Sequence, residues 1–222
     1  MKLWKVKDYL LMIVIVILVV LAVAALVGVI LYPLYWSTLQ YMKIFELLTG
    51  TGNGWYYIYF AIGGFALSFM NIPVFSMGRN DKVCVNLGGC ALPVALCIYL
   101  MYTHFSLVWT FSFAIALTVT TLFSRLFSWY MEGHGVLIMA IGVSLIAAAL
   151  AHFLAPTLLA KLLYCYIAGT IGPLIGADIL HLSAIARDGS WSKNMSIGGA
   201  GTKDGIWSIG LAAMFILFWL GW

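Results

Sequence analysis

Long apolar runs separated by short polar stretches dominate the pattern along this chain. A helix needs about 20 residues to cross a hydrocarbon core about 30 Å thick. In lipid, backbone groups must find their hydrogen-bond partners internally, so runs of this length predict membrane-spanning helices. The predicted spans are residues 9–31, 55–75, 83–102, 105–123, 135–155, 158–185 and 205–222.

The segment between the first two spans has a different pattern. Residues 34–48 include Lys43 and Glu46, with apolar residues at intervals of three to four positions. Such spacing is typical of an amphipathic helix, which we expect to lie along the membrane interface. The glycine-rich stretch 49–54 then ends the segment before the second span.

Composition supports the same class. Of the 222 residues, 64% are hydrophobic and only 8% are charged, whereas about 25% of an average soluble domain is charged. The sequence therefore predicts an all-α, polytopic helical integral membrane protein of about seven transmembrane helices. We expect one membrane domain over residues 1–222, a multi-pass location in the cell membrane, and the lipid bilayer as a partner. The net charge of +4 reports where the lysines and arginines lie relative to the membrane, so it does not indicate nucleic-acid binding.

The cations predict the orientation of the seven spans. Nine of them fall on one side of the membrane and only Lys43 and Lys161 on the other. By the positive-inside rule, the nine mark the cytoplasm, so the N-terminus is expected to be cytoplasmic. They are Lys2, Lys5, Lys7, Arg79, Lys82, Arg125, Arg187, Lys193 and Lys203. The first apolar run is longer than the 7–15 residues of a signal-peptide core, which favours an uncleaved span.

Two acids at the edges of apolar segments are the candidate catalytic residues. Asp178 lies in the sixth span, and Asp204 stands just before the seventh. A carboxylate in or beside a span is costly unless it is paired, hydrated or protonated, so it indicates a functional site. If the two carboxylates meet, repulsion forces them to share one proton, as in aspartic proteases. A hydrated interfacial Asp178 and a helix-capping Asp204 are the structural alternatives.

Helical spacing separates Asp178 from the glycines before it. His181 shares the helix face of Asp178, whereas Gly169, Gly172 and Gly176 lie on another side. Small residues let a second helix approach closely, so we expect these glycines to pack and the two polar residues to face a polar interior. Pro173 leaves the carbonyl of Gly169 without a donor and is expected to bend the helix before Asp178.

Two glycine-rich segments are the predicted substrate-binding elements. The third span contains Asn86, Gly88 and Gly89 before Pro93, a combination that weakens a helix. The second segment, residues 196–202, is too apolar for an ordinary linker and is a candidate re-entrant loop beside Asp178. The predicted substrate-binding residues are Asn86, Gly88, Gly89, His181, Gly198, Gly199 and Gly201.

Other catalytic and cofactor motifs are missing from the sequence. There is no His-Glu-x-x-His, Gly-x-Ser-x-Gly or phosphate-binding loop, and no haem-attachment pattern, so we expect no cofactor. The four cysteines lie singly in apolar runs and are expected to act as small packing residues. We assign no metal site, although Asp178, His181 and Asp204 are residue types that bind cations.

Four motifs resemble those of a family of polytopic archaeal and bacterial membrane proteins, domain-of-unknown-function family number 1614. The resemblance covers about residues 60–220 and implies a membrane fold, but it brings no established activity. The motifs are Met70-Asn-Ile-Pro73, Val85-Asn-Leu-Gly-Gly89 with Pro93, Ala168-Gly-Thr-Ile-Gly172 running into Gly176-Ala-Asp-Ile-Leu180, and Ser196-Ile-Gly-Gly-Ala-Gly-Thr202 with Asp204-Gly-Ile206.

A second resemblance is to intramembrane aspartyl proteases of the presenilin and prepilin-peptidase class. Their second acid belongs to a Gly-x-Gly-Asp motif at a helix start. Gly199-Ala-Gly-Thr-Lys-Asp204 is similar to that motif with two additional residues. Ala91-Leu-Pro93 is similar to their Pro-Ala-Leu motif, although it lies in the third span rather than near the C-terminus.

Three functional hypotheses remain open at this point. The first is an intramembrane peptidase that uses Asp178 and Asp204 on membrane-protein substrates. The second is an ion- or proton-coupled transporter with broken helices at 86–93 and 196–204, because discontinuous helices present backbone groups to ions and solutes. The third is a non-catalytic membrane subunit. The placement of Asp178, Asp204 and Asn86 relative to one another distinguishes them.

Overall fold

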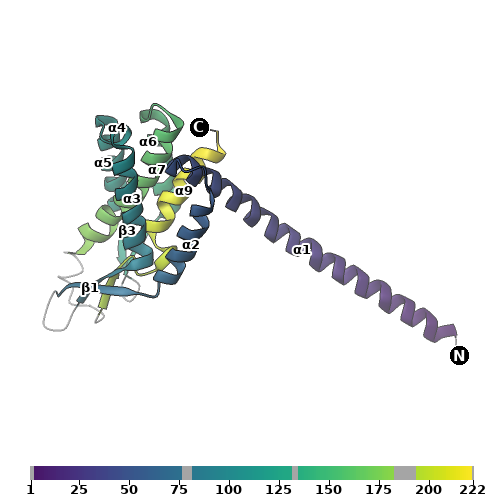
Figure 1. The fold of residues 1–222 in the computed structure, drawn as a ribbon. Coiled ribbons are helices and arrows are strands. Elements are labelled where there is room, and N and C mark those ends of the chain that lie inside the picture. The colour runs from purple at the N-terminus through teal and green to yellow at the C-terminus, as the bar shows by residue number, and fades with distance from the viewer. Residues whose placement is uncertain (1–2, 77–81, 132–134, 183–193, 222) are drawn as a thin grey trace. The chain divides into compact units, whose positions relative to one another are not determined.

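Residues 1–41 and residues 42–222 form two units in the structure, a computed structural model. It describes all residues except 1–2, 77–81, 132–134, 183–193 and 222, which Figure 1 draws as a thin grey trace. Helix α1 (Leu3–Thr49) makes up the first unit and continues into the second. Pro33 lies inside this helix, so one continuous helix covers both the predicted span 9–31 and the predicted interfacial segment 34–48. A proline removes one backbone hydrogen bond, but apolar neighbours with good helix propensity carry the helix past it.

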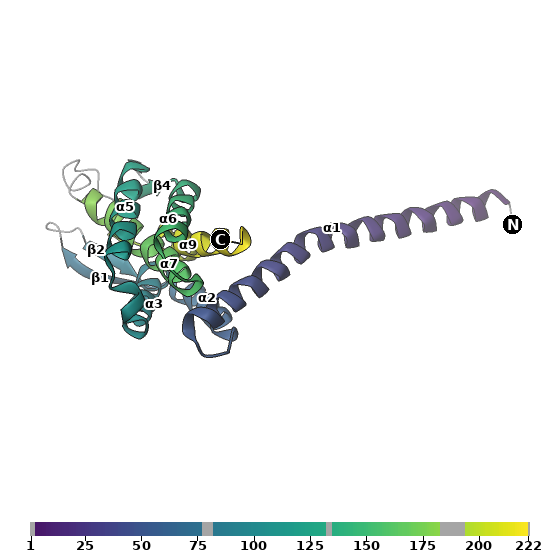
Figure 2. The same ribbon diagram turned by 90° about the horizontal axis from the view of Figure 1, so that it is seen from above.

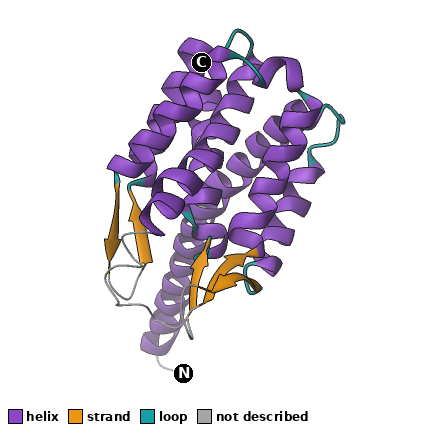
Figure 3. Ribbon diagram, turned by 90° about the vertical axis from the view of Figure 1, so that its left-hand side faces the viewer, coloured by secondary structure: helices purple, strands orange, loops and turns teal. Residues whose placement is uncertain are grey.

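The second unit is a bundle of helices with two small sheets at one end (Figure 3). The last turns of α1 belong to it, because Ile44, Phe45 and Leu48 are almost completely buried. The other helices are α2 (Trp55–Leu67), α3 (Leu92–Thr103), α4 (Phe105–Val108), α5 (Phe111–Leu126), α6 (Ala140–Leu154), α7 (Leu158–Pro173) and α9 (Gly205–Trp219). Short irregular helical turns are η1 (Leu87–Ala91), η2 (Leu174–Asp178), η3 (Ile179–His181) and η4 (Gly201–Lys203).

Helix α7 forms the centre of this bundle. It packs against α3, α5, α6 and α9, and Figure 2 shows these four helices around it. Every residue from 162 to 170 is buried. Burying apolar side chains such as Leu162, Leu163 and Ile167 contributes about 1.5–3 kcal/mol each when the reference state is water. Anything attached to the end of α7 therefore has a rigid support.

Two small sheets, which the all-α prediction does not include, lie at one end of the bundle. In the first, β1 (Asn71–Ser76) pairs antiparallel with β2 (Lys82–Asn86), and β2 pairs parallel with β5 (Asn194–Ile197). In the second, β3 (Ser128–Met131) pairs antiparallel with β4 (Gly135–Ile138). Short apolar runs suit strands and buried helices equally, and pairing with a distant segment decides between them.

These strands shorten several predicted spans. The helix of span 55–75 ends at Leu67, span 83–102 begins as strand β2, and span 135–155 begins as strand β4. Span 105–123 is interrupted between α4 and α5, where the Thr110 hydroxyl accepts the N–H of Phe113 and starts a new helix. Helical structure in the sixth span is described as far as Leu182, and residues 183–185 lie outside the described part.

The class prediction is confirmed in its coarser form, because the described chain is mostly helical. Within the described residues, one helical stretch, Leu158–His181, is long and apolar enough to cross a membrane. Five shorter apolar helices have 10–17 residues each. They are Trp55–Leu67, Leu87–Thr103, Phe111–Leu126, Ala140–Leu154 and Gly205–Trp219.

Candidate functional site

Asp178 stands where the regular hydrogen bonding of the central helix ends. Pro173 has no N–H to donate, and the chain continues as the π-helical turn η2 and then as the 3-10 turn η3. The expected break before Asp178 is therefore a change of helix type. Because η2 is wider than an α-helix, it alters the direction in which Asp178 points relative to ideal α-helical spacing.

The three glycines before Asp178 hold this segment against its neighbours. A Cβ at Gly169 would lie 2.8 Å from the Cα of Gly210 in α9, and one at Gly172 would lie 3.0 Å from the Thr120 methyl in α5. A Cβ at Gly176 would overlap the carbonyl of Thr121. The prediction that these glycines pack against other helices is therefore confirmed.

Asp204 is fixed by backbone donors at the start of α9. Its Oδ1 accepts the N–H of Ile206 at 3.1 Å, and its Oδ2 accepts the N–H of Ala200 at 3.4 Å. Asp204 thus caps the last helix, as the structural alternative expected. Burial raises the pKa of Asp204, while its bonds from backbone N–H groups act in the opposite direction because they favour the charged form.

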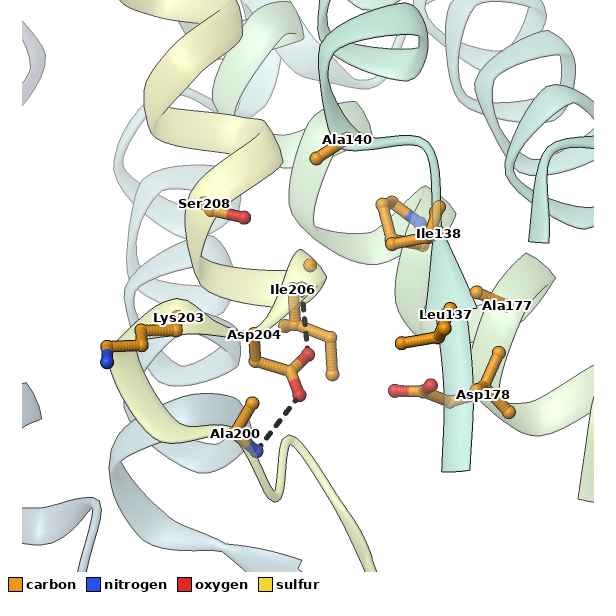
Figure 4. Close-up of a pocket in the computed structure, with 13 residues that line it drawn as sticks. Leu137, Ile138, Ala140, Ala177, Asp178, Ala200, Lys203, Asp204, Ile206 and Ser208 are labelled. Carbon is orange, nitrogen blue, oxygen red and sulfur yellow. Dashed lines mark hydrogen bonds between the residues drawn. The ribbon is translucent and has the colours of Figure 1, made fainter. Parts of the chain in front are cut away.

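Both acids line one cavity of about 170 Å³ at the sheet end of the bundle. Figure 4 shows their carboxyl groups turned toward each other, Asp178 from η2 and Asp204 from the start of α9. Oδ2 of Asp178 is buried and has no hydrogen-bond partner among the described residues. The cavity walls come from β4, from the end of α7 with η2, and from the loop that enters α9.

Two carboxyl groups that face each other across a cavity repel each other when both are ionised. If one of the two groups holds a proton, the cavity contains one acid and one base that face each other. The unpartnered oxygen of Asp178 is available to a water molecule or to a carbonyl oxygen of a ligand. The arrangement is therefore suited to moving protons.

His181 lies outside the cavity. Its Nε2 is 2.6 Å from Nη1 of Arg125 on α5, and its Nδ1 is 2.6 Å from the carbonyl oxygen of Ala177. Because a guanidinium only donates, Nε2 must accept and Nδ1 must carry the proton that is donated to Ala177. His181 is thus a neutral brace for the turn that carries Asp178.

The predicted cation-site alternative is not formed by the described residues. No three His, Cys, Asp or Glu side chains among them come together in an arrangement suited to a metal ion. His181 is held by Arg125 while Asp178 and Asp204 face the cavity.

Asn86 is likewise placed away from the two acids. It is 0% exposed, its Nδ2 donates to the Ser68 carbonyl at 2.8 Å and to Asn71 Oδ1 at 3.0 Å, and its Oδ1 accepts the N–H of Gly89 at 2.7 Å. Ser196 donates to the same Asn71 oxygen at 2.6 Å. The Asn86 side chain therefore ties the end of α2, β1 and η1 together, Asn71 extends this network to β5, and Asn86 does not line the cavity.

The predicted substrate-binding glycines pack chain against chain. A Cβ at Gly88 would overlap the Gly64 carbonyl, and one at Gly89 would overlap the Gly198 carbonyl. A Cβ at Gly201 would lie 2.6 Å from the Ser68 hydroxyl. Gly198 and Gly201 also have positive φ angles of 72° and 64°, which glycine adopts without strain.

Gly199 completes this packed segment. A Cβ there would lie 2.8 Å from the Ser196 carbonyl oxygen. None of these five glycines lines the cavity with the acids. Their packing against η1 and α2 fixes the loop that leads to Asp204.

Sequence reasoning missed most of the cavity wall. The wall includes Val136, Leu137 and Ile138 of β4, together with Ala140 and Ser208. Lys203 also lines the cavity. Among these wall residues, it is the one that the sequence could have linked to the site, because it directly precedes Asp204. The β4 residues were predicted to be the start of a span, where backbone groups bond to one another inside a helix.

Comparison with known proteins gives one family. The profile of the family described as protein of unknown function (DUF1614) matches residues 56–216, which include both acids and both glycine-rich segments. No curated protein and no solved structure matched the chain.

Proposed function

Because the chain belongs to DUF1614, a family of unknown function, we propose its function from the geometry of the site. We propose that it is an integral membrane hydrolase in which Asp178 and Asp204 act together on peptide bonds. One observation carries this proposal. The two acids face each other across one cavity, and an oxygen of Asp178 is buried there without a partner.

Each carboxyl group takes one role in peptide hydrolysis. Asp204, which accepts two backbone N–H bonds, is the ionised base and takes a proton from water as the water oxygen attacks the peptide carbonyl carbon. Asp178 is the protonated acid and gives its proton to the carbonyl oxygen. The C–N bond then breaks: Asp204 gives its proton to the leaving amine nitrogen, and Asp178 takes a proton back from one hydroxyl of the tetrahedral intermediate, which becomes the carboxyl group of the product. One water is consumed, and one shared proton remains.

The proposed membrane placement keeps seven spans in a single domain, a cytoplasmic N-terminus and the bilayer as partner. Lys82, Arg125 and Lys203 lie next to the two sheets, whereas Lys161 lies in the first turn of α7 at the other end. This bias supports a cytoplasmic sheet end, and hence a cytoplasmic position for both acids. Lys2, Arg79, Arg187 and Lys193 lie outside the described residues.

Helix length refines this placement. Helices of 13–17 residues measure about 20–26 Å, which is shorter than a typical hydrocarbon core. We propose that the bilayer thins around the bundle, as it does around short hydrophobic segments. Thinning brings cytoplasmic water closer to the cavity, where hydrolysis consumes it.

Cleavage assays test the enzyme proposal. The full chain is reconstituted in lipid nanodiscs with a library of fluorescently labelled single-span peptides, and products are identified by mass spectrometry. Asp178→Asn and Asp204→Asn are each expected to lower the cleavage rate by about 10³-fold, because each removes one of the two proton-transfer groups. Glu46→Gln makes the same chemical change on an exposed residue outside the cavity and should leave the rate unchanged. Unchanged cleavage in both aspartate variants contradicts the proposal.

Proton- or ion-coupled transport is the second candidate, and one observation favours it. The two interrupted segments, at Asn86–Pro93 and Ser196–Asp204, pack directly on each other through Gly89 and Gly198. If the chain is a transporter, a pH-sensitive dye inside proteoliposomes would report proton flux, and Asp178→Asn would abolish that flux. No peptide would be cleaved. Absence of both cleavage and flux would leave the non-catalytic membrane subunit. For Asn86 and the five glycines, we now propose a role in holding Asp204 in place.

A further inference from the structure

Strand β4 has one edge that is paired and one that is not. Its register with β3 matches Trp129 with Leu137 and Tyr130 with Val136. Just beyond the strand, the N–H of Met139 donates to the carbonyl of Phe127 at 3.0 Å. Hydrogen-bonded and non-hydrogen-bonded pairs alternate along an antiparallel ladder. The pair Trp129 and Leu137, two residues from the bonded pair Phe127 and Met139, is therefore hydrogen-bonded as well. The backbone groups of Val136 and Ile138 consequently point away from β3.

These outward groups have no backbone partner in the part of the chain that the structure describes. Val136, Leu137 and Ile138 nevertheless all line the cavity that holds the acids. Successive side chains of a strand point to opposite faces, so three consecutive residues line one cavity only when it borders the strand's edge. Figure 4 shows β4 running directly beside Asp178.

One of the two edge strands of the other sheet provides a contrast. Strand β1 contains Pro73, which has no N–H, and its pairing with β2 is irregular between Pro73 and Phe75. Proline and bulges are common means of preventing an edge strand from pairing with another chain. Strand β4 has neither feature, and its free groups border a cavity instead of bulk surface.

We infer that the free edge of β4 binds the substrate, which is a segment of polypeptide in extended conformation. The substrate adds to the sheet as a third strand, with main-chain hydrogen bonds to Val136 and Ile138, and its scissile bond then lies beside Asp178 and Asp204. This inference rests on the proposed function and specifies its substrate class. A helical membrane segment must therefore unwind locally before it is cleaved.

A set of chemically altered probes tests the inference without changing the protein. The parent probe is a capped eight-residue peptide of alternating alanine and valine, in which a non-cleavable hydroxyethylene group replaces the central peptide bond. Each remaining amide N–H is then replaced, one at a time, by N-methyl. Binding to the full chain in nanodiscs is expected to weaken about tenfold at every second position, since one lost hydrogen bond is worth about 1.4 kcal/mol. Equal effects at all positions, or at none, overturn the inference.

A protein variant tests the same edge from the other side. Val136→Pro removes an outward N–H and leaves the bonds to β3 in place, and it is compared with Val136→Ala, which keeps the N–H. The proline variant is expected to bind the parent probe at least tenfold more weakly than the alanine variant. Equal binding overturns the inference. If the proline variant does not fold, the N-methyl series decides the question alone.

Separate measurements of binding and cleavage distinguish the two proposals. Alternating N-methyl effects without cleavage of any unmodified peptide would contradict the proposed hydrolase but support the docking edge. Cleavage that depends on Asp178 and Asp204, with no alternation in the binding series, would support the hydrolase and overturn the docking edge.

Discussion

The helix bundle is interrupted by a π-helical turn at Leu87–Ala91 and by another at Leu174–Asp178. The polar side chains at these two interruptions differ in their hydrogen bonding. Asn86 at the first is fully buried and makes three hydrogen bonds. Asp178 at the second has a buried oxygen with no partner among the described residues. A buried group without a partner costs about 1–3 kcal/mol. The first interruption therefore lowers the energy of the fold, whereas the second raises it.

The space around the two interruptions also differs, because the first is tightly packed and the second borders a cavity. Backbone fills the space around the first interruption, where Gly88 and Gly89 leave no room for a Cβ. A cavity of about 170 Å³ with a second carboxyl group borders the other. Groups that cost stability persist where function requires them. This contrast, rather than the presence of a broken helix, is the reason to place the proposed site at the second interruption.

The sharpest test exchanges an amide and a carboxyl group in opposite directions. Asp178→Asn is expected to lower peptide cleavage by about 10³-fold and to raise the free energy of unfolding by about 1 kcal/mol, because repulsion by Asp204 disappears. Asn86→Asp is expected to lower the free energy of unfolding by about 3 kcal/mol, because two donors are lost and a charge is buried. Unfolding by denaturant in detergent micelles and the cleavage assay measure these changes.

The two exchanges contradict the comparison if they behave alike. Equal destabilisation by Asp178→Asn and Asn86→Asp would mean that Asp178 has a structural hydrogen-bond role like that of Asn86. A normal cleavage rate in Asp178→Asn would remove the functional half of the contrast.

A glycine pair tests how tightly the first interruption is filled. Gly89→Ala places a methyl group on the Gly198 carbonyl and is expected to cost about 3 kcal/mol, because backbone rather than a flexible side chain must move. Gly63→Ala adds the same methyl group in α2 where nothing lies within 4 Å, and it should stabilise the helix by up to about 1 kcal/mol. Thermal unfolding compares the two, and equal melting temperatures would refute the close packing.

The acids were accessible to sequence reasoning because a carboxyl group among apolar residues is costly wherever the chain folds. Helical periodicity also separated Asp178 from Gly172 and Gly176 correctly, since both glycines pack on α5. Local spacing therefore separated Asp178 from these two glycines, but it also grouped His181 with Asp178, whereas His181 bonds to Arg125 on α5. It did not predict the π-helical turn after Pro173, which redirects Asp178 and His181.

The rest of the site depends on contacts that a linear pattern does not contain. His181 turns to Arg125, which is 56 positions earlier in the chain. Residues 135–138 are as apolar as the helix that follows, and only their pairing with Ser128–Met131 makes them a strand. Whether Asn86 binds a ligand or braces the fold depended on Ser68 and Asn71, which the sequence alone did not connect to it.

The pH dependence of stability probes the second interruption further. Burial raises the pKa of Asp204 in the folded protein above the value of about 4 for an unfolded carboxyl group. The folded state thus binds the proton more tightly, and this contribution to stability is fully present below about pH 4 and is lost as pH rises through the raised pKa. Asp204→Asn should flatten this fall in stability. A wild-type profile that rises over the same range would contradict the assignment.

The smallest expected effect comes from the cation that braces the site. Arg125→Met removes the donor to His181 Nε2. Because the arginine is exposed, the loss should lower the free energy of unfolding by only about 1 kcal/mol. The turn that carries Asp178 becomes looser, so cleavage should slow about threefold. Lys161→Met is the matched control, since Lys161 Nζ lies 3.3 Å from His152 Nδ1 at the other end of the bundle. That change should leave cleavage at the wild-type rate. If both variants slow cleavage equally, the loss is one of general stability, and Arg125 has no positioning role at the acids.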